Sequence, residues 1–153
     1  MNSFADAENL PDQFQRALSY WREIKGDGPI PYRHDFDPLD IPQLLPHVIL
    51  TEVVRGKCED RFEDFRFRLI GSYVDDRVKE KYAGRNLSTI DGKGPGSGIW
   101  EAYCEVEKEQ TPTIKSFEYL GSAENLKKSW ELYLPLSKSG ERVDFIVVIL
   151  LFE

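Results

Sequence analysis

The chain opens with the pattern of an amphipathic helix. Its apolar side chains recur with the spacing of one helical face: Phe14, Ala17, Leu18, Trp21 and Ile24. Proline suits a first helical turn and glycine a helix end, as at Pro11 and Gly26. We therefore predict a helix over residues 10–26.

Five later segments have the composition and alternation of β-strands. They are residues 47–54, 64–71, 111–121, 129–137 and 142–152. In the second, Phe65, Phe67 and Leu69 alternate with Arg66, Arg68 and Ile70. In the fourth, Trp130, Leu132, Leu134 and Leu136 share a face, and Pro135 predicts a bulge or an early end. The last is apolar on both faces, which is typical of a central strand covered on both sides.

Two helices are predicted between the second and third strands, at residues 73–82 and 99–109. The last strand can be central only if it lies beside the first. We therefore expect an α+β fold in one domain, residues 1–153. Its five-stranded antiparallel sheet carries the middle helices on one face and the N-terminal helix on part of the other.

Charge and hydropathy narrow the set of partners. The chain has 27 Asp and Glu against 20 Lys and Arg, a formal net charge of -7, which repels phosphate backbones. We therefore expect no nucleic acid. The longest apolar run, 145–152, is too short to span a bilayer as a helix, and the first residues lack a signal-peptide pattern. We expect a cytoplasmic protein with no membrane partner.

Three runs carry a family resemblance, in order along the chain: DFDPLDIPQLLPHVILTEVV, FRFRLIGSYV and YAGRNLSTI. Together with the preceding YWREIKGDGPIPYRHDF, they resemble a PAS-like family of small, mostly uncharacterised bacterial proteins, common in alphaproteobacteria. The resemblance covers residues 20–90 closely and rests on strand order beyond them. It implies a PAS core at residues 47–152. PAS domains sense small ligands, redox state or light, or mediate pairing, and pass a signal to a partner protein.

The same resemblance bears on cofactors. In flavin-binding PAS photoreceptors a reactive cysteine follows a Gly-Arg-Asn turn, and here Leu87 occupies that place. The turn itself has an ordinary structural explanation, in which Gly84 relaxes the backbone and Asn86 caps the next turn. Haem-binding PAS domains use a histidine from the helical middle section, whereas the last histidine here is His47. We expect no flavin, no haem and no metal.

We expect a mostly apolar cavity between the sheet and the middle helices, holding a small apolar or carboxylate ligand. The residues predicted to bind it are Phe67, Arg68, Leu69, Trp100, Tyr103, Trp130 and Leu132. Arg66 and Arg68 share a strand face, where two guanidinium forks could hold a carboxylate. The alternative is that they pair with sheet neighbours such as Glu52 or Asp144.

Two functions follow. The first is a sensory or regulatory module without enzymatic activity. With no recognisable output domain, it would act in trans through protein–protein contact with an unknown signalling partner. The alternative is a small cone-like α+β isomerase or ligand carrier, which needs a convergent acid/base group in the cavity. A last strand beside the first favours the PAS fold.

We also predict a homodimer. The N-terminal helix would present Phe14, Leu18, Trp21 and Ile24 to a sheet face of which it covers roughly two-thirds. The remaining strip would be an apolar patch, which soluble monomers rarely expose. Pairing two such faces would bury both. The rival arrangement folds this helix completely over its own sheet.

Overall fold

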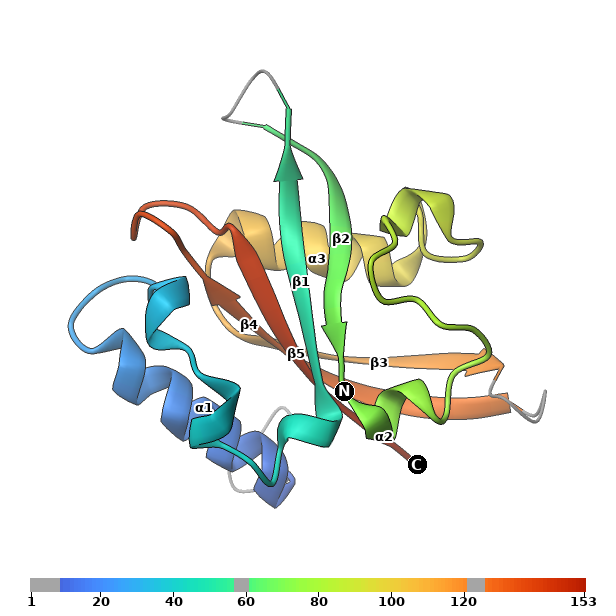
Figure 1. Cartoon of the computed structure of the whole chain (residues 1–153), viewed down its shortest axis with the longest axis horizontal. Coiled ribbons are helices and arrows are strands. Elements are labelled where there is room, and N and C mark those ends of the chain that lie inside the picture. Colours follow the sequence, from blue (N-terminus) through green and yellow to red (C-terminus); the bar gives the residue numbers. More distant parts are fainter. Residues whose placement is uncertain (1–8, 57–60, 121–125) are drawn as a thin grey trace.

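A five-stranded antiparallel sheet forms the centre of the computed structural model, which describes residues 9–56, 61–120 and 126–153 (Figure 1). The strands are β1 (Val48–Arg55), β2 (Phe62–Ile70), β3 (Thr113–Leu120), β4 (Leu126–Leu136) and β5 (Phe145–Phe152). Their spatial order is β2-β1-β5-β4-β3. The last strand therefore lies beside the first and in the middle of the sheet, and the predicted fold class is confirmed.

The two apolar faces of β5 explain its central place. Ile146, Val148 and Leu150 enter one buried cluster. Val147 and Ile149 enter a second cluster on the opposite face. The sheet is thus a middle layer between two apolar layers, and each layer needs its own cover.

The first layer is covered by α3 (Gly98–Glu109), which crosses behind β1 and β2 in Figure 1. The Ser97 side chain accepts a hydrogen bond from the backbone N–H of Trp100 and so caps the start of α3. The helix predicted at 73–82 is much shorter than expected, since α2 spans only Ser72–Asp75. Charged residues dominate after Asp75, so no apolar stripe holds a longer helix against the sheet, and short helices are marginal without such packing.

The second layer is covered by α1 (Asp12–Lys25) and the 3₁₀ turns that follow it: η2 (Arg33–Asp35), η3 (Pro38–Asp40) and η4 (Leu45–His47). The Trp21 indole N–H donates a 2.8 Å hydrogen bond to the carbonyl of Pro135, which ties α1 to β4. Phe36 and Leu44, from the turns, complete the cover beside α1. Among the described residues, the core of this cluster is therefore buried within the chain.

This arrangement corrects the predicted dimer interface. Phe14, Leu18 and Trp21 are buried against their own sheet, and Ile24 packs at the edge of the same cluster. Their apolar faces are occupied within the chain, as in the rival arrangement, so they offer no surface to a second copy. The homodimer itself stays a prediction, and it needs another surface.

Pro135 neither bulges nor ends β4. It pairs with Ile146, and the register with β5 continues to Leu136 without a shift. The Pro135 carbonyl points to Trp21 rather than to β5. A strand residue directs its N–H and C=O to the same side, so the missing proline N–H removes no bond to β5.

Among the described residues, no helix has the length and hydropathy needed to cross a bilayer.

Candidate functional site

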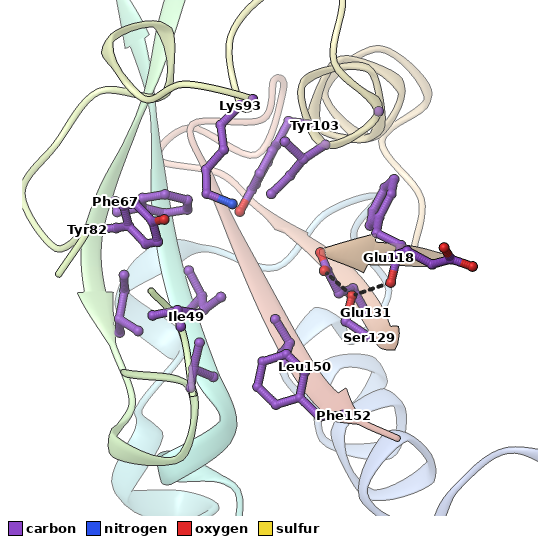
Figure 2. Close-up of a pocket in the computed structure, with 17 residues that line it drawn as sticks. Ile49, Phe67, Tyr82, Lys93, Tyr103, Glu118, Ser129, Glu131, Leu150 and Phe152 are labelled. Atoms are coloured by element: carbon purple, nitrogen blue, oxygen red, sulfur yellow. Dashed lines mark hydrogen bonds between the residues drawn. The ribbon is translucent and has the colours of Figure 1, made fainter. Parts of the chain in front are cut away.

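A cavity of about 210 Å³ lies between the sheet and the elements on the α3 side (Figure 2). Its walls come from all five strands, from α2 and α3, and from the loop that connects those helices. Most of the wall is apolar, and its main apolar side chains are Ile49, Phe67, Ile70, Val74, Leu150 and Phe152. A mostly apolar cavity between the sheet and the middle helices was expected, but its lining differs from the predicted set.

Of the seven predicted ligand residues, two line the cavity, Phe67 and Tyr103. Trp100 belongs to the same buried layer but packs against Phe65, with ring centroids 5.0 Å apart, outside the cavity. The other four were misplaced, two on β2 and two on β4. Each error has its own structural cause.

An irregularity in β2 misplaced Arg68 and Leu69. Leu50 pairs with Leu69, and the next residue, Thr51, pairs with Phe67, so Arg68 is an extra residue in the strand. A bulge of this kind reverses the alternation beyond it. Ile70 therefore faces the cavity, while Leu69 is 39% exposed.

The two β2 arginines contact the sheet rather than the cavity. Arg68 Nη1 lies 3.3 Å from Glu52 Oε1, and Arg66 Nη1 lies 3.6 Å from the same oxygen. Arg66 Nε also donates a 2.8 Å hydrogen bond to the Asn86 side chain. Pairing with sheet neighbours, the alternative considered from the sequence, is the arrangement found.

The opposite face of β4 was the missed part of the site. Trp130 and Leu132 point into the α1 layer, so they do not reach the cavity. Ser129 and Glu131 alternate with them and line the cavity instead. The sequence did contain a clue to this burial. β4 lies beside β5, which is apolar on both faces, so the face of β4 that carries Ser129 and Glu131 is also covered.

Glu131 is 5% exposed, and both its carboxylate oxygens are hydrogen-bonded. Oε1 accepts a 2.5 Å bond from the Tyr133 hydroxyl, and Oε2 accepts a 2.9 Å bond from the Ser129 hydroxyl. Burial raises the pKa of Glu131, while these two bonds and the charge of Lys93 oppose the rise. Burial and the neighbouring Glu131 also raise the pKa of Tyr133 well above its usual range.

Lys93 supplies the cavity's cation. It enters from the loop before α3, and its nitrogen points into the cavity, toward the hydroxyl end of Tyr103 (Figure 2). Its Nζ lies 5.1 Å from the centroid of the Tyr82 ring. Burial lowers the pKa of Lys93, and the nearby Glu131 partly offsets this effect. The Tyr103 hydroxyl shares a 2.9 Å hydrogen bond with Thr51 Oγ1.

The Gly-Arg-Asn turn runs along β2 rather than into the cavity. Gly84 has a φ of +86°, and its N–H donates a 2.7 Å bond to the carbonyl of Phe67. Leu87, at the place of the photoreceptor cysteine, is fully buried in the core and is not part of the cavity wall. The Asn86 side chain accepts from Arg66 instead of capping the following turn.

Within the ranges that the structure describes, no three or more His, Cys, Asp or Glu side chains are grouped so as to hold a metal ion.

An antiparallel sheet of this order, with a cavity beneath the helices on one face, is the arrangement of a small α+β domain of the PAS-like class. The family model described as PAS domain matches residues 11–150, and the chain belongs to that family. The resemblance to a PAS-like family is therefore confirmed, and this family indicates a sensory or regulatory module. No curated protein matches the chain at a significant level.

Proposed function

We propose that this PAS domain binds a small molecule in its internal cavity, and that occupancy regulates a partner protein by direct association. The cavity carries this proposal. Protein interiors are packed as densely as organic crystals, and voids larger than a water molecule are few. A cavity of about 210 Å³ could hold roughly seven waters at ~30 Å³ each, so a ligand would be small.

The cavity wall suggests a route for the signal. Tyr82, Gly92 and Lys93 belong to the loop between α2 and α3, and they close one side of the cavity. A ligand that contacts this loop and the sheet together stabilises the loop positions that fit it. A partner protein that contacts the loop would then distinguish the occupied domain from the empty one.

The alternative enzymatic role has one observation in its favour. Glu131 and Lys93 place an acid and a base on the cavity wall, as the isomerase hypothesis required. A general base must reach the proton that it removes. Both oxygens of Glu131 are instead engaged by Tyr133 and Ser129, and the strand order is that of a PAS domain. The strand order therefore favours binding over turnover, and Lys93 is the base that remains available to the enzymatic alternative.

Thermal unfolding in the presence of a panel of small compounds tests the binding role. The panel contains short apolar alcohols, amides, amines and carboxylates. A ligand at one hundred times its Kd adds ~2.7 kcal/mol, which raises the Tm of a domain of this size by about 5–10 °C. At least one compound class is expected to produce such a shift.

A cavity-filling variant shows whether the shift reports on the cavity. Ile49→Phe adds volume to the wall and is expected to abolish the shift. Leu69→Phe, on the exposed side of the neighbouring strand, is the matched control and is expected to keep it. No shift with any class, or an equal shift in Ile49→Phe, would contradict ligand binding here. Conversion of a bound compound in proportion to the protein concentration would favour the enzyme.

A further inference from the structure

Lys93 is the charged group in the cavity whose bonding is incomplete. Across the parts of the chain that the structure describes, its ammonium makes no hydrogen bond and no ion pair, and Nζ lies over the Tyr82 ring, 5.1 Å from the centroid. Polar groups removed from water are nearly always hydrogen-bonded, and charged ones are paired. This half-buried ammonium points into a mostly apolar cavity, where a bound anion would supply the partner that the described residues do not.

The other charged groups near the cavity do not supply that partner. Among the described residues, the nearest is Glu131, whose charge favours the ammonium but which forms no ion pair with it; its two oxygens accept bonds from Tyr133 and Ser129. Glu118 lies on the rim, and its carboxylate points away from the cavity (Figure 2). Arg66 and Arg68 contact Glu52 rather than the cavity. Lys93 is thus the one cation that the described wall offers, which suits a single negative charge and leaves a phosphate dianion under-neutralised.

A second donor stands beside the cavity's cation. The Tyr103 hydroxyl shares its 2.9 Å hydrogen bond with Thr51, and either oxygen can be the donor. When Thr51 donates, the Tyr103 proton is free to point into the cavity. An ammonium and a hydroxyl together match the two oxygens of one carboxylate, and such charge-assisted bonds are the stronger kind.

The rest of the wall defines the remainder of the ligand. Ile49, Ile70, Leu150 and Phe152 line the space away from Lys93, and they offer only apolar contact. The volume of about 210 Å³ fits a short chain or a single ring. Building on the proposed ligand-binding function, we infer that the cavity recognises a small monocarboxylic acid with an apolar tail. Its carboxylate binds Lys93 and Tyr103.

Calorimetry with three compounds of one chain length tests the charge preference. Hexanoate, hexanamide and hexylamine share their apolar tail and differ in the polar end. The wild-type protein is expected to bind hexanoate at least about tenfold more tightly than hexanamide, and hexylamine more weakly still. Equal binding of hexanoate and hexanamide, or tighter binding of hexylamine, would overturn the inference and leave the small-molecule function standing.

Variants assign the preference to Lys93. Lys93→Met keeps the length of the side chain without its charge, so the preference for hexanoate over hexanamide is expected to disappear while hexanamide still binds. Lys79→Met, at an exposed position away from the cavity, is the matched control. Tyr103→Phe is expected to weaken hexanoate several-fold and hexanamide less, which provides a second variant at the same site.

The remaining outcomes separate the two proposals. An unchanged preference for hexanoate in a folded Lys93→Met protein would overturn the role of Lys93. Failure of all three compounds, together with failure of the wider panel, would remove the proposed function itself. Circular dichroism of each variant establishes that it has folded.

Discussion

Glu131 is a buried carboxylic acid in the middle of the sheet. Its carboxyl is buried on the cavity wall, and burial raises its pKa despite the bonds from Tyr133 and Ser129. The titratable groups that face it are Lys93 from the loop, Tyr103 from α3 and Tyr133 from its own strand. Burial raises the pKa of both tyrosines, so they stay protonated while Glu131 titrates.

A pH-dependent stability follows at this residue. The pKa of Glu131 is higher in the folded protein than in the unfolded chain, so folding retains its proton. Below the unfolded pKa, near 4.3, both states are protonated and the carboxyl has no pH effect. As pH rises from there to the folded pKa, the free energy of unfolding falls by up to ~1.4 kcal/mol per pH unit. Above the folded pKa the loss is complete.

Glu131→Gln removes this dependence. The amide keeps an acceptor for Tyr133 and has no proton to lose. The variant is therefore expected to gain stability relative to the wild type as pH rises from about 4 to about 8, a range that begins at the unfolded pKa of a glutamate. Urea unfolding of both proteins at the two pH values measures the difference. Glu118→Gln, at an exposed rim position, is the control. A constant difference between Glu131→Gln and wild type would show that Glu131 does not titrate as described.

At the scale of elements, Asp64 holds the loop after α2 against β2. Its Oδ1 accepts from the backbone N–H of Phe65 at 2.8 Å and of Ser88 at 3.2 Å, and its Oδ2 accepts from the Ser88 hydroxyl. The Arg66–Asn86 hydrogen bond adds a second tie between β2 and the same loop. The loop continues to Lys93, so these bonds also position the cation of the cavity.

Asp64→Ala is expected to loosen this loop. It removes the acceptor of the Ser88 N–H; because Ser88 is exposed, water can replace that acceptor, so the loss is about 1 kcal/mol, as for a typical hydrogen bond. Hydrogen exchange should accelerate at Ser88 and Leu87 while β5 stays protected. Asp76→Ala, at an exposed position after α2, is the control. Unchanged exchange at Ser88 in Asp64→Ala would mean that the loop is held by other contacts.

At the scale of the whole molecule, α1 and the turns after it complete the second apolar layer. They cover side chains from the middle of the sheet, including Leu132, Leu134, Val147 and Ile149. Burying Phe14, Leu18 and Trp21 contributes about 1.5–3 kcal/mol each. The sum, about 5–9 kcal/mol, is comparable with the whole stability of a typical domain.

A form lacking the residues before Gly26 is therefore expected to lose its cooperative thermal transition or to self-associate through the uncovered sheet face. Circular dichroism melting and sedimentation velocity distinguish these results. A truncated form that remains monomeric with an unchanged Tm would show that α1 is dispensable.

Sedimentation of the intact chain at micromolar concentration tests the homodimer prediction separately, since any dimer of this structure would use a surface other than the stripe of α1.

Much of the fold was predictable because it depends on local periodicity. The apolar stripe of residues 10–26 became α1, and the double-sided apolar run at the end of the chain became the central strand. The helix predicted at 73–82 was wrong in length, since α2 spans only Ser72–Asp75. Whether a short helix forms depends on its packing more than on the helix propensity of its residues. The cofactor and enzyme expectations remain predictions.

The candidate site was only partly predictable. Phe67 and Tyr103 were predicted correctly because each lies on the apolar face of its own element, Phe67 on β2 and Tyr103 on α3. Both faces meet in the apolar layer between the sheet and α3. Arg68 and Leu69 were misassigned because one extra residue in β2 reverses the alternation, and no residue type marks that position. Trp130 and Leu132 were assigned to the cavity because they are apolar, whereas the cavity contains the polar residues of the opposite face.

The sequence by itself determined the strands, the central place of β5, the PAS family and the amphipathic character of α1, because each is encoded in periodicity or a run of residue types. Tertiary structure alone decided which face of β4 meets the cavity and that α1 covers its own sheet. It alone brought Lys93 and Glu131 to one wall. These features depend on which helices pack on each face of the sheet. Alternation within a strand defines two faces, but it does not determine which element covers each face.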